Sequence, residues 1–225
     1  MSSTTNILIL LLALPLVSFS QKKKDVDTVK VERSYRPTQL RFGTDVFALV
    51  RTVTQEGYRG WELNADADIY RYFLALDFGS SAMDKKSETD HYENSGTYFR
   101  IGGDFNFLKK DVDKNALFLG LRYARSKFSE DMTIVGTDPV WGAYQDVYTN
   151  KNATASWIEA TGGLKVRIWK MLWLGYTARF KFGVKASENP DMVSHDIPGF
   201  GSFEEKTTWG FNYQMFFTIP LKKKE

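Results

Sequence analysis

Residues 172–184 read LWLGYTARFKFGV, and apolar and polar side chains alternate along this stretch. The even-numbered positions carry Leu, Leu, Tyr, Ala, Phe, Phe and Val, whereas the odd-numbered positions include Thr177, Arg179 and Lys181. Successive side chains of a β-strand point to opposite faces of the sheet. The stretch is therefore expected to form a strand with one apolar face and one polar, charged face.

Seven other segments share this alternation, and the connections between the segments follow a pattern of their own. The eight expected strands cover residues 39–50, 60–69, 72–79, 98–108, 116–126, 156–169, 172–184 and 207–221. The connections cover residues 51–59, 70–71, 80–97, 109–115, 127–155, 170–171 and 185–206, so long and short ones alternate. Tight periplasmic turns alternating with longer outer loops are typical of outer-membrane barrels. The expected fold is all-β: an eight-stranded antiparallel up-and-down transmembrane β-barrel with short periplasmic turns and long outer loops.

The direction of the apolar face follows from the volume inside such a barrel. Eight strands enclose an interior just wide enough for side chains to fill. The apolar positions hold dozens of large aliphatic and aromatic residues, which would overfill that space, whereas the small and charged set fits. The apolar face is therefore expected to point outward to lipid. The aromatic girdles near the strand ends are expected to contain Trp61, Tyr72, Tyr98, Tyr123 and Trp209.

The charged residues of the opposite face are expected to fill the interior. They are Arg41, Asp45, Glu62, Asp66, Asp68, Asp77, Arg100, Asp104, Arg122, Glu159, Lys165, Arg167, Arg179 and Lys181. Acidic and basic members are equal in number, and buried charges persist only when they are paired and hydrogen-bonded. Two interpretations remain open: an ion-pair core that closes the barrel, or a narrow path for cations or protons.

The N-terminus has the pattern of an export signal. Residues 7–17 form an apolar run that is long enough for a signal-peptide core but too short to span a bilayer as a helix. Ser18 and Ser20 place small residues where a signal peptidase reads the chain. The expected organisation is a cleaved signal peptide (1–20), a charged periplasmic tail (21–37), the barrel (38–221) and a basic C-terminal tail (222–225), with both termini in the periplasm.

Few residues suggest chemistry. The chain has no cysteine, and its formal net charge of +3 does not indicate nucleic-acid binding. Its two histidines, His91 and His195, fall in expected outer loops, and Ser194 and Asp196 flank the second. A catalytic triad needs three groups that converge in space, which adjacent residues of one loop rarely do. We therefore expect no catalytic, cofactor-binding or metal-binding residues, no cofactor and no enzymatic activity.

The three longest expected loops are acidic. Residues 80–97, 127–155 and 185–206 together contain 13 acidic and 6 basic residues, whereas the termini and short turns are net basic. One interpretation is a set of solvated polar loops. The other is an acidic cap that recruits divalent cations near the lipid head groups.

A segment of ten residues leads into the first expected strand: Arg36-Pro37-Thr38-Gln39-Leu40-Arg41-Phe42-Gly43-Thr44-Asp45. With this motif and the strand pattern, residues 36–221 resemble a family of bacterial outer-membrane β-barrel proteins that is classified as a domain of unknown function. The chain is also similar to small OmpA/OmpX-type eight-stranded barrels. Two departures from these barrels are expected: no periplasmic peptidoglycan-binding domain, and a last strand that ends in Ile219-Pro220-Leu221, which displaces the usual terminal aromatic.

The pattern and the resemblance together imply a function class. The chain is expected to be a non-enzymatic outer-membrane barrel that acts in envelope integrity or surface interaction through its acidic outer loops. Its expected partners are outer-membrane lipids and lipopolysaccharide, with the barrel assembly machinery and periplasmic chaperones during biogenesis. Two alternatives remain: a lipid-modifying enzyme that acts at the barrel rim through His91 or His195, and a soluble lipocalin-like carrier.

Overall fold

The computed structural model describes residues 36–108, 115–187, 194–203 and 206–221. The expected signal peptide, almost all of the N-terminal tail and the basic C-terminal tail lie outside these described residues. The strands are β1 (Gln39–Asp45), β2 (Tyr58–Ile69), β3 (Tyr72–Lys86), β4 (Asp90–Asn106), β5 (Ala116–Asp138), β6 (Gly142–Arg167), β7 (Leu172–Ala186), β8 (Asp196–Ile197), β9 (Gly201–Ser202) and β10 (Thr208–Pro220). One helix, α2 (Val46–Thr54), follows β1.

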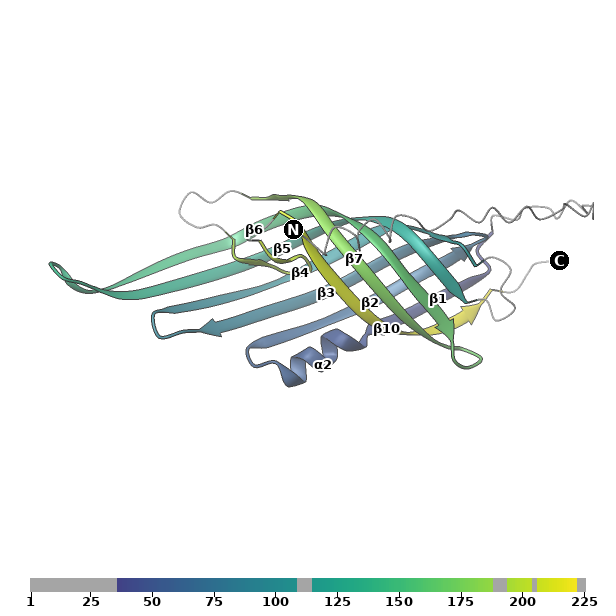
Figure 1. The fold of residues 1–225 in the computed structure, drawn as a ribbon, viewed down its shortest axis with the longest axis horizontal. Helices are drawn as coiled ribbons and strands as arrows, with labels where there is room; N and C mark the ends of the chain where they lie inside the picture. The colour runs from purple at the N-terminus through teal and green to yellow at the C-terminus, as the bar shows by residue number, and fades with distance from the viewer. Residues whose placement is uncertain (1–35, 109–114, 188–193, 204–205, 222–225) are drawn as a thin grey trace, which may run out of the picture. The chain divides into compact units, whose positions relative to one another are not determined.

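Eight of these strands close into an antiparallel barrel, as expected from the sequence. The order around the barrel is β1-β10-β7-β6-β5-β4-β3-β2, and β8 and β9 form a separate two-stranded sheet. The first and last strands close the ring through pairs that run from Gln39↔Pro220 to Asp45↔Gln214. Figure 1 shows the slanted strands of the barrel and, at one end, the tight turns. We call this the turn end and the opposite end the hairpin end.

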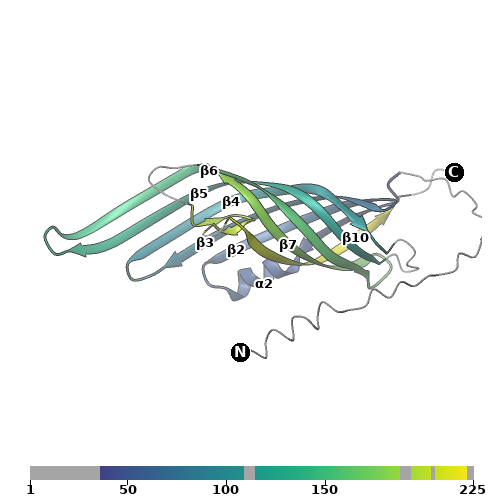
Figure 2. The same ribbon diagram turned by 45° about the horizontal axis from the view of Figure 1, so that its top comes forward.

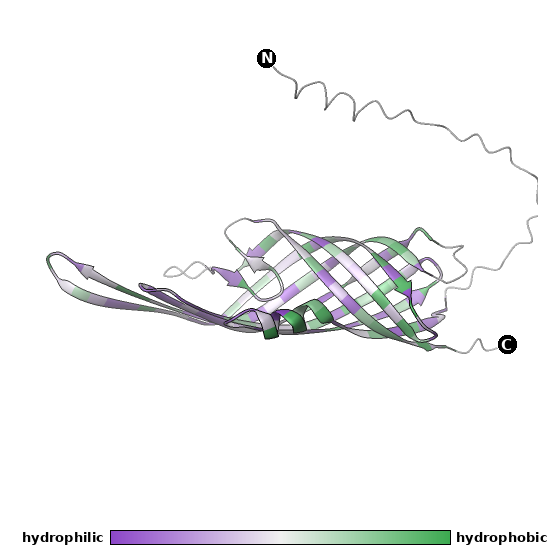
Figure 3. Ribbon diagram, turned by 60° about the horizontal axis from the view of Figure 1, so that its bottom comes forward, coloured by the Kyte–Doolittle hydropathy of each residue, from purple (hydrophilic) through white to green (hydrophobic). Residues whose placement is uncertain are grey.

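The alternation of side chains has the direction that the sequence predicts. Large apolar residues such as Leu74, Leu119 and Phe211 are exposed on the outside, whereas charged residues such as Arg41, Asp104 and Arg179 are fully buried. The hydropathy colours alternate along each barrel strand accordingly (Figure 3). Twelve of the fourteen expected interior charges are buried, and the other two, Asp68 and Arg167, are half-buried.

The first strand is shorter than expected. The interval 39–50 was expected to be one strand, but β1 ends at Asp45 and the chain turns into α2. The Asp45 carboxylate accepts a hydrogen bond from the backbone N–H of Phe47 at 3.0 Å, which caps the first turn of the helix. Val46 continues the alternation of Leu40 and Phe42, and for this reason the pattern concealed the boundary.

Two of the long outer loops are in fact strands. β3 and β4 pair out to Lys86↔His91, and β5 and β6 pair out to Asp138↔Gly142. Residues 130–150 of β5 and β6 therefore continue past the last β6–β7 pair, Ala155↔Ala186, as an extension that we call the arm (Figure 2). Outside a barrel wall both faces of a strand can be polar, so the alternation that marks a strand fades there.

Two residues that were expected to point outward, Tyr98 and Val184, point inward. Tyr98 is buried inside the barrel rather than in a girdle, and its hydroxyl donates to Glu62 Oε2 at 2.7 Å. Val184 packs against an interior apolar cluster that includes Trp157. Gly183 has a φ of 65°, and the β6–β7 register shifts between Ser156 and Ile158, so the inside and outside positions exchange beyond this point.

Candidate functional site: the interior and the hairpin end

Three buried arginines join four buried carboxylates in the barrel interior. Arg100 pairs with Glu62 (2.5 Å) and Glu159 (2.9 Å), Arg179 with Glu159 (2.9 Å) and Asp77 (3.1 Å), and Arg122 with Asp77 (2.5 Å) and Asp104 (2.8 Å). Arginine is suited to this arrangement because its planar fork of N–H groups can serve two carboxylates at once. The geometry supports the ion-pair core that was one of the two interpretations of the interior.

A second charged cluster lies in a layer of aromatic rings. Asp66 accepts from Arg41 at 2.6 Å and from Lys165 at 2.8 Å. The Arg41 guanidinium lies 4.5 Å from the centre of the Phe73 ring, and the Lys165 ammonium lies 4.9 Å from the centre of the Phe118 ring. Aromatic faces attract cations, so these rings share in stabilising the two charges.

The sequence predicted an interior filled by small and charged residues. The structure also places large aromatic rings there. Buried rings in the interior include Trp157 and the four rings of the aromatic layer, Phe73, Phe118, Trp173 and Phe216. Two of these rings fit because a glycine faces each of them: a Cβ added at Gly175 would lie 2.8 Å from Phe216 Cε2, and one at Gly163 would lie 2.9 Å from Phe118 Cζ. The glycines make room for rings where a side chain would collide.

Residues 194–203 fold into the mouth of the barrel at the hairpin end. Ile197 and Phe200 are fully buried, and the Phe200 ring packs edge-on against Trp157 with centroids 5.5 Å apart. Arg100 Nη2 donates to the Gly199 carbonyl at 2.9 Å, and Lys181 Nζ donates to the carbonyls of Gly199 and Phe200. This segment was expected to be part of a loop, and its apolar residues were the signal that it packs inward.

A buried carboxylate anchors the start of this segment. Glu130 on β5 accepts from Ser194 Oγ at 2.7 Å, from Tyr92 Oη at 3.1 Å and from Asn150 Nδ2 at 3.2 Å. Burial raises the pKa of Tyr92 above its ordinary value of 10.0, so the phenol remains a hydrogen-bond donor. The network ties the segment to β4, β5 and β6.

His195 does not lie in a catalytic arrangement with its neighbours in the chain. His195 packs edge-on against Tyr92, at 5.4 Å between ring centroids, whereas the Ser194 hydroxyl turns to Glu130. Ser194, His195 and Asp196 therefore do not form the convergent triad that acyl transfer requires.

His91 lies in β4 rather than in a loop, and it meets two carboxylates. Its Nε2 is 3.0 Å from Asp84 Oδ1 and 2.9 Å from Glu93 Oε1. One ligand atom from each side chain falls within 4.8 Å of the others, so the exposed Asp84 and Glu93 and the half-buried His91 are the group that could hold a metal ion among the described residues. The sequence prediction had assigned no metal site.

The fold and the interior define the class: an eight-stranded antiparallel β-barrel with an apolar exterior and an ion-paired interior. No helix among the described residues is long and apolar enough to cross a membrane. The chain belongs to the family described as a domain of unknown function (DUF6048), whose sequence profile matches residues 1–224. The sequence analysis expected a domain-of-unknown-function family, and this membership is confirmed.

No curated protein matches the chain. Among solved structures, the chain is similar to the crystal structure of the N-terminal β-barrel domain of Pseudomonas aeruginosa OprF, with 12% sequence identity and a TM-score of 0.31. The match covers 83% of this chain and 99% of that chain. This similarity is too weak to bear on function.

Proposed function

We propose that this protein is a non-enzymatic outer-membrane β-barrel that acts in envelope integrity or surface interaction through its hairpin end. The observation that carries the proposal is the distribution of side chains across the barrel wall. Large apolar residues cover the outside of the barrel, and ion pairs fill the inside. In hydrocarbon a closed barrel satisfies every backbone hydrogen bond without exposing an edge, so this arrangement suits a bilayer.

The two ends of the barrel support an orientation. Short turns lie at the end where the described chain starts and finishes, and the arm projects from the other end. Outer-membrane barrels place their short turns in the periplasm. The proposal therefore places the turn end and both termini in the periplasm, and the hairpin end at the cell surface.

A closed interior supports a role other than a pore. The arginine network spans the barrel interior, the aromatic layer fills the turn end, and residues 194–203 occupy the mouth of the barrel at the hairpin end. We expect the barrel to conduct no ions, so its work would fall to the hairpins. The proposed contacts are with outer-membrane lipids and lipopolysaccharide, and assembly would need the barrel assembly machinery and periplasmic chaperones.

Two alternatives, a lipocalin-like carrier and an enzyme at the barrel rim, fit these side chains less well. A lipocalin-like carrier needs an apolar interior, and Arg41, Asp104 and Glu159 are fully buried in this one. A rim enzyme needs a nucleophile next to His91 or His195, and the Ser194 hydroxyl is bonded to Glu130 instead. Replacing both histidines with alanine tests the enzyme alternative, because only that alternative predicts a loss of lipid modification.

The first experiment combines extraction with gel migration. The protein should be recovered in the membrane fraction, and its unboiled form should run faster than its boiled form on a cold denaturing gel, because the closed barrel resists the detergent. Proteoliposomes that contain the folded protein should show no ion flux above that of empty liposomes. Recovery without detergent together with identical migration before and after boiling would refute the proposal.

A further inference from the structure

The barrel wall is incomplete at the hairpin end between β2 and β10. β1 pairs with β10 only as far as Asp45↔Gln214 and with β2 only as far as Thr44↔Leu63. Both neighbours continue beyond these pairs, so residues 58–62 of β2 and 208–213 of β10 face each other with no strand of the described chain between them. We call this interval the wall gap.

Helix α2 lies along the wall gap (Figure 1), and side chains of α2 and of Asp45, the last residue of β1, satisfy part of the backbone that β1 leaves unpaired. On the β10 side, the Asp45 carboxylate accepts from the backbone N–H of Tyr213 at 3.1 Å and from Asn212 Nδ2 at 2.6 Å. On the β2 side, the Thr52 hydroxyl accepts from the backbone N–H of Gly60 at 2.8 Å. The chain therefore accommodates the wall gap with specific side chains.

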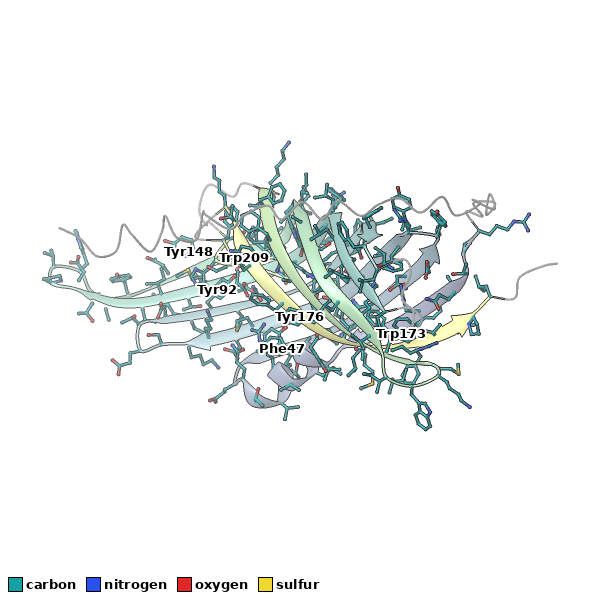
Figure 4. All side chains as sticks on the ribbon, turned by 45° about the vertical axis from the view of Figure 1, so that its right-hand side comes forward. Phe47, Tyr92, Tyr148, Trp173, Tyr176 and Trp209 are labelled. Atoms are coloured by element: carbon teal, nitrogen blue, oxygen red, sulfur yellow. The ribbon has the colours of Figure 1, made fainter. Side chains whose placement is uncertain are left out.

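A cavity of about 490 Å³ lies at the wall gap, and consecutive residues of β10 line it. Asn212 points to the interior and is buried, whereas Trp209 and Phe211 are 64% and 53% exposed on the exterior. Phe47 of α2 also lines the cavity, and Figure 4 labels Phe47 and Trp209. Adjacent residues of a strand point to opposite faces, so the lining combines interior-facing residues with residues whose side chains face outward. The volume of the cavity is in the usual range for small-molecule sites.

The charge in this cavity is net basic. Its basic lining residues are Arg51, Lys85, Arg100 and Lys181, and its acidic ones are Asp45, Glu62 and Asp196. Arg100 is paired with Glu62. Among the described residues, no carboxylate forms an ion pair with Lys181 or Arg51: the Lys181 ammonium bonds to two backbone carbonyls, and the Arg51 guanidinium lies over the Tyr58 ring at 3.9 Å.

We propose that the wall gap binds an amphiphile with an anionic head group and an acyl chain. The head group would sit between Lys181 and Arg51, and the chain would leave along the exposed faces of Trp209, Phe211 and Phe47. A buried ammonium without a carboxylate partner favours an anion, and the aromatic exterior favours a hydrocarbon chain. The proposal rests on the membrane location proposed above. The same chemistry could be supplied by a free fatty acid or by an acidic membrane lipid.

The test uses the full-length protein in nanodiscs of phosphatidylcholine, with insertion scored first by heat-dependent gel migration. The fluorescent fatty acid cis-parinaric acid is then titrated in. We expect saturable binding that palmitate displaces and that dodecyltrimethylammonium, a cationic amphiphile, does not displace. Displacement by phosphatidylglycerol as well would identify an acidic membrane lipid as a ligand, whereas displacement by palmitate alone would identify a free fatty acid.

Three variants locate the site. Arg51→Met and Lys181→Met should each weaken binding about tenfold, which corresponds to a lost charged hydrogen bond. Arg125→Met removes an exposed arginine of the wall that does not line the cavity and should bind like the parent protein. Arg51 lies on the surface helix, so its variant remains informative if the Lys181 variant does not fold.

The outcomes separate the two proposals. An inserted protein that shows only unsaturable partitioning, equal displacement by the cationic amphiphile, or unchanged binding by Arg51→Met would overturn the ligand proposal and leave the membrane proposal standing. A protein that does not insert would overturn both.

Discussion

Arg179 is the central residue of the interior network, because it joins Glu159, which Arg100 also binds, to Asp77, which Arg122 also binds. Nη1 lies 2.9 Å from Glu159 and Nη2 lies 3.1 Å from Asp77. Replacing it with leucine leaves both carboxylates with one arginine fewer in a buried site. We expect Arg179→Leu to lower the free energy of unfolding by about 3–5 kcal/mol, measured by urea unfolding in detergent micelles. Arg125→Leu on the exposed face is the control, and equal effects of the two changes would contradict the ion-pair core.

Gly175 and Phe216 form a matched pair in the aromatic layer. The Cβ of an alanine at position 175 would approach Phe216 Cε2 to 2.8 Å, which is closer than side-chain carbons normally pack. We expect Gly175→Ala to cost about 1–3 kcal/mol of stability through overpacking. Adding Phe216→Leu should recover part of this loss, because the smaller side chain vacates the space. A double-mutant cycle from unfolding curves measures the coupling, and additive effects would show that the two residues do not collide.

At the scale of elements, α2 takes the place of a strand only because side chains bond to the exposed strand edges. Thr52→Val removes the hydroxyl that accepts from the buried Gly60 N–H. The expected result is faster hydrogen exchange at the Gly60 amide and a loss of about 1–3 kcal/mol. Thr54→Val is the matched control, because the Thr54 hydroxyl is exposed and bonds only to the Val50 carbonyl within its own helix. Equal hydrogen exchange at the Gly60 amide in both variants would show that the Thr52 hydroxyl does not protect this amide.

The tip of the arm carries a turn that depends on pH. The Asp138 carboxylate accepts from the backbone N–H groups of Val140 (2.7 Å) and Trp141 (2.9 Å), and these bonds hold the pKa of Asp138 below its usual value of 3.8. A lowered pKa means that the turn is favoured above the ordinary carboxyl range and loses this support as pH falls through the lowered pKa. NMR titration of Asp138 should show this shift, and an ordinary or raised pKa would contradict the turn geometry.

The elements also show which patterns the sequence could reveal. The alternation located all eight wall strands, because each strand there has one side in the interior and one side outside. It failed at Asp45, where a helix begins in phase with the strand before it, and along the arm, where the alternation is lost. At Gly183 the phase reversed because a positive φ and a register shift insert a bulge, and no period-two pattern predicts such a change.

At the scale of the whole molecule, the proposed membrane location divides the exterior into a lipid-facing wall and a water-facing arm. Leu121 on the wall and Val147 on the arm are both 62% exposed, so local burial does not distinguish them. Leu121→Arg should lower the free energy of unfolding in lipid by about 2–4 kcal/mol, the cost of arginine near the middle of a bilayer. Val147→Arg should change it by less than about 0.5 kcal/mol, as for other surface changes.

The comparison needs folding and unfolding titrations in liposomes, with intrinsic tryptophan fluorescence as the signal. If Leu121→Arg is as mild as Val147→Arg, the wall does not face lipid and the membrane proposal fails. If Val147→Arg is as costly as Leu121→Arg, the arm lies in the bilayer and the proposed orientation of the two ends is wrong.

The sequence by itself determined the barrel class, the number of wall strands and the direction in which most of their side chains point. These features follow from local periodicity and from the volume that eight strands enclose. Only the tertiary structure decided that residues 194–203 fill the mouth, that Arg179 joins Glu159 to Asp77, and that the end of β1 leaves a gap in the wall. Each of these features depends on contacts between residues far apart in the chain, and a pattern within one segment carries no information about which distant segment will meet it.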